Sequence, residues 1–144
     1  MKQILMNLYL FWGAIQDLKE KKISLIYLKV GAILGVMFFT GEIKRQNLTV
    51  EEIILSFLPG LIFLFVAKIS REKIGVGDGW LFLIVASWLG SKETWALWQM
   101  SLILSSIFSL VMLITKKYSS SYCIAFIPFV WLSHLLLWSL YYGK

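Results

Sequence analysis

The sequence predicts an all-α, polytopic membrane protein, a bundle of about six transmembrane helices. Two observations lead to this fold class. First, 59% of the 144 residues are hydrophobic and the mean hydropathy is +0.78, whereas a soluble domain is nearer half apolar. Second, the apolar residues form long continuous runs, and they do not alternate with the period of two that is typical of a membrane β-barrel. We therefore expect the whole chain, residues 1–144, to form one transmembrane domain.

Six apolar segments follow one another along the chain, and each is predicted to be a helix. Their approximate spans are 3–18, 23–40, 50–69, 78–90, 94–115 and 121–142. A helix needs roughly 20 residues to cross a hydrocarbon core of ~30 Å. The third, fifth and sixth segments meet this length, and the second nearly does.

The first and fourth segments are shorter, and each carries an aspartate at one end. Asp17 ends the first segment and Asp78 begins the fourth. Local thinning of the bilayer or surrounding helices accommodate such short spans, and we expect both to end in a water-accessible cleft. The first segment starts after Lys2 as a signal peptide would, but no small-residue cleavage site follows it. We therefore interpret it as a retained helix.

The basic residues predict the orientation in the membrane. The loops after the first, third and fifth segments carry eight Lys and Arg, and the opposite side carries five. The eight are Lys19, Lys21, Lys22, Lys68, Arg71, Lys73, Lys116 and Lys117, and the five are Lys2, Lys44, Arg45, Lys92 and Lys144. By the positive-inside rule, the first group lies in the cytoplasm and both termini lie outside. This topology places Asp17 and Asp78 at the cytoplasmic face of the plasma membrane.

Asp17 and Asp78 are the only aspartates in the chain, and their shared depth suggests a pair of carboxyl groups. Two adjacent carboxyl groups cannot both ionise cheaply, so one holds a proton while the other is charged. Such a pair provides a general base for water and a general acid for a peptide bond, as in aspartic proteases. A plainer interpretation remains for each residue: Asp78 as the N-cap of a helix after a glycine-rich turn, and Asp17 as an ordinary interface residue beside lysines.

Other chemistries have little support in the composition. Cys123 is the only cysteine and His134 the only histidine, so neither a disulfide nor a cysteine-based zinc site is expected, and no cofactor is implied. We expect His134 to bond to a neighbouring helix rather than to line a cleft. The net charge of +6 comes from loop residues, which membrane topology explains, so we do not expect nucleic acid as a partner. Tryptophans near segment ends, Trp88 among them, are expected to form an interfacial belt.

Three motifs resemble those of the type IV prepilin peptidase family, intramembrane aspartic proteases of the GxGD type. The family has an Asp at a helix end, a basic stretch and then Ile-Pro-Asn, which residues 17–25 follow as far as Ile23 before Ser-Leu replaces Pro-Asn. The family's G-x-G-D stands here as Gly75-Val76-Gly77-Asp78, followed by Gly79, and the basic residues before it correspond to Arg71 and Lys73.

The third motif lies in the last segment. The family often carries Ile-Pro-Phe-Gly-Pro-Phe there, and this chain has Ile127-Pro128-Phe129 followed by Val-Trp. Larger family members also have a cytoplasmic insert with paired Cys-x-x-Cys that is linked to N-methylation. This chain lacks that insert and resembles a short, peptidase-only form.

The resemblance implies an aspartic endopeptidase with Asp17 and Asp78 as catalytic residues and with Gly75, Gly77 and Gly79 shaping the approach of the substrate. We expect the glycines before Asp78, Gly75 and Gly77, to allow a tight turn, with backbone that other residues adopt poorly. The implied partner, besides the lipid bilayer, is a prepilin or pseudopilin precursor with a short basic leader, a small residue before the cut and a hydrophobic helix after it. The oligomeric state is left open.

Two alternatives from other functional classes stand beside the peptidase. A non-enzymatic scaffold for filament or secretion-system assembly predicts that neither aspartate matters. A small proton-coupled transporter predicts acidic groups near the middle of the membrane and an internal repeat. Because both aspartates are expected at one face, the sequence argues against the transporter, and the scaffold stays the leading alternative to the peptidase.

Overall fold

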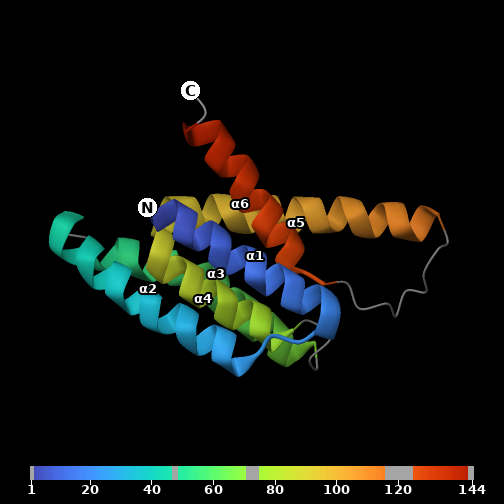
Figure 1. The fold of residues 1–144 in the computed structure, drawn as a ribbon, viewed down its shortest axis with the longest axis horizontal. Coiled ribbons are helices and arrows are strands. Elements are labelled where there is room, and N and C mark those ends of the chain that lie inside the picture. Colours follow the sequence, from blue (N-terminus) through green and yellow to red (C-terminus); the bar gives the residue numbers. More distant parts are fainter. Residues whose placement is uncertain (1, 47–48, 71–74, 116–124, 143–144) are drawn as a thin grey trace. The chain divides into compact units, whose positions relative to one another are not determined.

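A computed structural model describes residues 2–46, 49–70, 75–115 and 125–142 of the chain. These residues form six α-helices and no strand (Figure 1). The helices are α1 (Lys2–Glu20), α2 (Leu25–Gln46), α3 (Val50–Ile69), α4 (Val76–Leu89), α5 (Ser91–Ile114) and α6 (Ile127–Tyr142). Each of the six predicted segments therefore contains a helix, and the all-α prediction is confirmed.

Predicted and observed boundaries differ by six residues at the end of α2 and at the start of α6, and by two at the start of α4. Helix α4 begins at Val76, two residues before Asp78, so that the glycine motif lies within its first turn. Helix α6 begins at Ile127, and the carbonyl of Phe126 accepts hydrogen bonds from the amides of Phe129 (3.0 Å) and Val130 (3.3 Å). Pro128 suits this first turn because its missing N–H removes no bond from within the helix.

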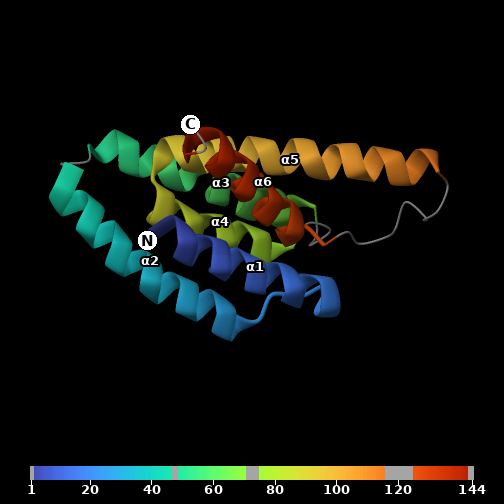
Figure 2. The same cartoon turned by 45° about the horizontal axis from the view of Figure 1, so that its top comes forward.

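The chain divides into two compact units. The first contains residues 3–21 and 97–144, and the second contains residues 22–96. In the first unit, polar and aromatic contacts join α1 to α6, and Phe108 of α5 packs against Phe129 of α6 with ring centroids 5.2 Å apart. The second unit contains α2, α3 and α4, with α4 packed against both of the others (Figure 2).

Helices α3 and α4 pack antiparallel at two glycines. An added Cβ at Gly60 of α3 would lie 2.8 Å from the backbone nitrogen of Leu83, and one at Gly79 of α4 would lie 3.0 Å from that of Leu64. The two contacts are reciprocal, because each helix contributes one glycine and one leucine four residues apart. Backbones come this close only where no side chain intervenes, as is common in membrane helix pairs.

Helix α2 packs on α4 through Trp88, which is 1% exposed. Its indole N–H donates to the carbonyl of Gly31 at 3.1 Å, and its ring lies 4.9 Å from that of Phe38. The expectation that Trp88 belongs to an interfacial belt is therefore wrong. A belt prediction rests on position along the segment alone, whereas the register of α4 against α2 turns this side chain inward.

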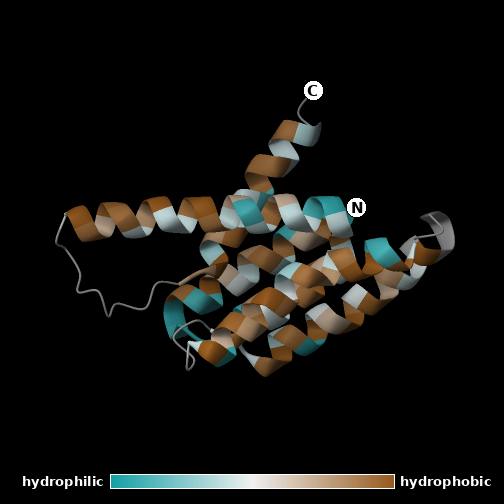
Figure 3. Ribbon diagram, turned by 180° about the vertical axis from the view of Figure 1, so that it is seen from behind, coloured by the Kyte–Doolittle hydropathy of each residue, from teal (hydrophilic) through white to brown (hydrophobic). Residues whose placement is uncertain are grey.

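Two helices, α3 and α5, are long and apolar enough to cross a membrane, and three shorter apolar stretches lie in α2, α4 and α6. Much of the C-terminal part of α5 is hydrophobic (Figure 3), and its Ile107, Leu110 and Ile114 are exposed. Exposed apolar side chains in such number are expected where lipid, not water, surrounds a helix. The helices therefore support a membrane protein, while six complete spans stay a prediction.

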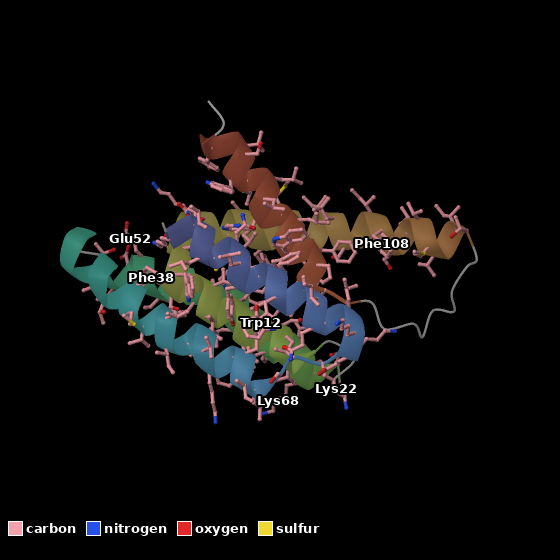
Figure 4. The ribbon with its side chains drawn as sticks, viewed as in Figure 1. Trp12, Lys22, Phe38, Glu52, Lys68 and Phe108 are labelled. Atoms are coloured by element: carbon pink, nitrogen blue, oxygen red, sulfur yellow. The ribbon has the colours of Figure 1, made fainter. Side chains whose placement is uncertain are left out.

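Charged residues mark the two ends of the second unit. Lys22 and Lys68 lie at one end, and Glu52 lies at the other (Figure 4). Glu52 belongs to a capping box at the start of α3, in which the Thr49 hydroxyl accepts from the Glu52 amide and the Glu52 carboxylate accepts from the Thr49 amide. The orientation of this unit in the membrane stays a prediction.

Candidate active site

Asp78 lies in the first turn of α4, three residues after Gly75, which is the N-cap of the helix. The amide of Asp78 donates to the carbonyl of Gly75 at 3.0 Å. Its carboxylate also turns back over the N-cap, because an added Cβ at Gly75 would lie 3.1 Å from Oδ2 of Asp78. The interpretation of Asp78 as the N-cap residue is wrong: the helix begins at Val76, two residues before the predicted start, and its N-cap is Gly75.

The three motif glycines are needed for space, not for unusual backbone. The N-cap Gly75 has φ −63°, and among the described residues only Gly90 and Lys21 have positive φ. The expectation of a tight turn with special backbone at Gly75 and Gly77 is therefore wrong. The motif starts a regular helix, so its residues adopt ordinary backbone angles.

Neighbouring side chains occupy the space beside two of these glycines. An added Cβ at Gly77 would lie 2.7 Å from Cδ1 of Ile23, and one at Gly79 would lie 2.7 Å from Cδ2 of Leu64. Gly77 thus packs against Ile23, two residues before α2, and Gly79 packs against Leu64 of α3. Both glycines hold the first turn of α4 close to its neighbours, which orients Asp78.

Asp17 lies in the last turn of α1 and is 7% exposed. Its Oδ2 accepts a hydrogen bond of 3.0 Å from the N–H of Ile127, and the amide of Phe126 also donates to this carboxylate. The interpretation of Asp17 as an ordinary interface residue is wrong, because the first turn of α6 covers it. The carboxylate instead accepts donors that a helix start leaves unsatisfied.

The end of α1 has its own termination signal. Lys21 has φ 50°, and its amide donates to the carbonyl of Asp17 at 2.9 Å. A residue in the left-handed region with this bond is a common helix C-terminal cap. The cap ends α1 at Glu20, three residues after Asp17, so that the aspartate lies in the last turn.

Further contacts join α1 to α6 along their length. The Trp131 indole donates to Oδ1 of Asn7 at 3.0 Å, the Phe11 and Trp131 rings lie 5.0 Å apart, and Nε2 of His134 lies 3.0 Å from Oε1 of Gln3. The prediction that His134 bonds to a neighbouring helix is confirmed.

The structure brings Asp78 together with Gly75, Gly77 and Gly79 at the start of α4, in the second unit. It places Asp17 in the first unit, with Ile127. The pairing of the two carboxyl groups stays a prediction. Arg71 and Lys73, the basic residues before the glycine motif, lie outside the described residues.

The sequence model of the type IV leader peptidase family matches residues 4–114. The chain belongs to the type IV leader peptidase family. The resemblance inferred from the motifs is thereby confirmed, and membership indicates a membrane-bound peptidase with a prepilin-like substrate. No curated protein and no solved structure matches the chain.

The residues that the family model matches include nearly all of α1 and all of α2 to α5, and hence both aspartates and all three motif glycines, but they do not include α6. Among the described residues of this family member, no three His, Cys, Asp or Glu side chains gather as a metal site would require. The catalytic roles of Asp17 and Asp78 stay a prediction.

Sequence reasoning did not assign a role to the residues that position the aspartates. Ile23 and Leu64 are ordinary apolar residues in sequence, and nothing in their local pattern predicts that each faces a glycine. Ile127 carried a weak signal, since an apolar residue before Pro at the start of an apolar run predicts a helix start. Nothing in the sequence around Asp17 or around Ile127 predicts that the carboxylate of α1 contacts the start of α6.

Proposed function

We propose that this chain is an intramembrane aspartic endopeptidase that removes the short basic leader of prepilin-like precursors at the cytoplasmic face of the membrane. The family match carries the proposal, since it spans the Asp17 context and the glycine motif at Asp78 together. Asp17 and Asp78 form the catalytic pair. They share one proton, so that one carboxyl group serves as base and the other as acid.

Several features of the chain support a common membrane depth for the two residues. Asp78 lies in the first turn of α4, where Ile23 packs on Gly77, and Lys22, next to Ile23 in the chain, lies with Lys68 at one end of the second unit (Figure 4). Only six residues of chain lead from Asp17 to Ile23, which span at most ~21 Å when fully extended. The excess of Lys and Arg in these loops favours the cytoplasmic side.

The chemistry needs no group beyond the two carboxyls and a water molecule. The ionised carboxylate takes a proton from water while the water oxygen attacks the carbonyl carbon of the scissile peptide bond. The protonated carboxyl gives its proton to the carbonyl oxygen. Collapse of the tetrahedral intermediate breaks the C–N bond, and the leaving amine receives a proton from the pair.

The substrate shape suits an active site at a membrane boundary. A precursor of this class has a hydrophobic helix that lies in the bilayer and a basic leader that remains in water. With both aspartates in terminal turns of their helices, the bond between leader and helix reaches the carboxyl groups without unfolding of the substrate helix in lipid. The same terminal positions speak against a proton-coupled transporter with acidic groups at mid-membrane.

One observation favours a second candidate, the non-enzymatic scaffold. The carboxylate of Asp17 already has a structural role, because it accepts donors from the start of α6. In a scaffold, Asp17 would only join α1 to α6, and Asp78 would only stabilise the first turn of α4.

Co-expression with a precursor separates the two candidates. The probe is a membrane protein with a basic leader, a Gly before the cut and an apolar helix, followed by its size on a gel. Asp17→Asn and Asp78→Asn are each expected to abolish processing while the protein remains folded in the membrane. Glu20→Gln and Glu93→Gln are matched controls, since Glu20 shares the last turn of α1 and Glu93 the first turn of α5. Processing by either aspartate variant at the wild-type rate would refute the catalytic pair.

A further inference from the structure

Every backbone N–H group at the start of α6, from Phe126 to Val130, forms a hydrogen bond. The amides of Phe129 and Val130 both donate to the carbonyl of Phe126. Pro128 has no N–H. The two remaining donors, at Phe126 and Ile127, both go to the carboxylate of Asp17. A side chain from α1 therefore completes the capping of α6, and every donor of this turn has an acceptor.

We propose that the first turn of α6 is the positioning element of the catalytic Asp17: the backbone amides of Phe126 and Ile127 hold the carboxyl group in the orientation that the reaction requires. This inference rests on the proposed function and extends it to a helix outside the residues matched by the family model. It assigns a function to the Ile-Pro-Phe sequence: Ile127 supplies an N–H donor to Asp17, and Pro128 has no N–H that would need a further acceptor.

Three physical features make this turn suitable for positioning. Backbone amides are rigid donors, because the helix fixes their direction. Ile127 is fully buried, which leaves the turn little freedom to shift. The positive end of the helix dipole also stabilises a carboxylate placed there. An aspartate held by a flexible side chain would lose part of this pre-organisation, which is worth up to about 100-fold in rate for a displacement of ~1 Å.

The contacts farther along α1 and α6 maintain the register of the two helices. Asn7 and Trp131 form a hydrogen bond of 3.0 Å, and Asn7 lies ten residues before Asp17, about 15 Å along the helix. A change at Asn7 therefore alters the position of Asp17 only through the packing of α1 on α6, without touching the carboxylate.

The test removes the Ile127 donor while leaving Asp17 in place. Ile127→Pro deletes the N–H at the first position of a helix, where proline is well tolerated. Ile127→Ala is the matched control, since it loses more side-chain volume than the proline variant but keeps the N–H. Both are purified as full-length chains in detergent, checked by thermal unfolding, and assayed on the precursor probe for kcat and KM separately.

We expect kcat of Ile127→Pro to be about 10- to 100-fold below that of Ile127→Ala, with KM within twofold. If the Ile127 amide had only a structural role, Ile127→Pro would yield less folded protein, but the folded protein would have the same kcat as Ile127→Ala. Equal kcat values for the two variants would overturn the inference. If Ile127→Pro does not fold, Asn7→Ala decides the matter. A kcat several-fold below that of Ser133→Ala, whose hydroxyl bonds only within α6, supports positioning, and an equal kcat refutes it.

The result is separable from the proposed function itself. Full activity of Asp17→Asn overturns the catalytic pair and this inference together. Loss of activity in Asp17→Asn, combined with equal rates for Ile127→Pro and Ile127→Ala, overturns the inference alone.

Discussion

Oδ2 of Asp17 accepts a hydrogen bond of 3.0 Å from the backbone N–H of Ile127, 110 positions later in the chain. The bond joins the last turn of α1 to the first turn of α6 and involves a buried carboxylate. Asp17 therefore has both a structural and a proposed catalytic role, and the following predictions separate them.

Asp17→Leu should destabilise the protein much more than Asp17→Asn. The leucine leaves the amides of Phe126 and Ile127 buried without an acceptor, at a cost of about 1–3 kcal/mol. The asparagine keeps an acceptor oxygen and should retain most of the stability, although it loses activity. Thermal unfolding of the two variants in the same detergent measures the difference. Equal melting temperatures would show that the carboxylate does not cap α6.

Gly79→Ala should weaken the packing of α3 on α4. Its methyl group would meet both the side chain and the backbone of Leu64, and the backbone cannot move away cheaply, so we expect a loss of about 1–3 kcal/mol. Gly41→Ala is the control, because nothing lies within 4 Å of an added Cβ there. That change should instead stabilise by up to about 1 kcal/mol through helix propensity. Unfolding curves showing the opposite order would contradict the α3–α4 contact.

Gly77→Ala should lower activity by displacing the start of α4, and Ile23→Ala should restore part of it. The added methyl group meets Ile23 rather than backbone, so shortening Ile23 makes room. A double-mutant cycle on cleavage rate and on melting temperature gives the coupling between the two sites. Additive effects would mean that Ile23 does not pack on Gly77.

Gly75→Ala should reduce cleavage with little loss of stability. A Cβ at Gly75 would lie 3.1 Å from Oδ2 of Asp78, so the carboxylate must shift by a few tenths of an ångström, while the exposed N-cap has no packing to lose. The expected signature is a lower kcat at an unchanged melting temperature. A wild-type kcat would show that the orientation of Asp78 over the N-cap is not needed for the reaction.

Cysteine labelling tests the predicted orientation. In a Cys123→Ser background (position 123 lies outside the described residues), Glu51→Cys should react with an impermeant reagent in intact cells, and Lys22→Cys should react only after lysis. The two positions lie near opposite ends of the second unit, since Glu51 adjoins Glu52 (Figure 4). Labelling of Lys22→Cys from outside would reverse the topology and move the active site to the other face.

The sequence by itself determined the helical class, the six segments and the two aspartates as the residues of interest. These properties are local: an apolar run, the Thr49–Glu52 capping box and the glycine motif before Asp78 each act within a few residues, so a short window contains their whole physical cause. Tertiary structure alone decided that Gly79 receives Leu64, that Trp88 is buried against α2, and that Ile127 holds Asp17. Each of these contacts depends on how two helices pack and in which register. The local sequence of two apolar helices does not distinguish one register from several others. The choice among them is made by close backbone approach at glycines and by the need of each buried donor for an acceptor, which only the assembled helices satisfy.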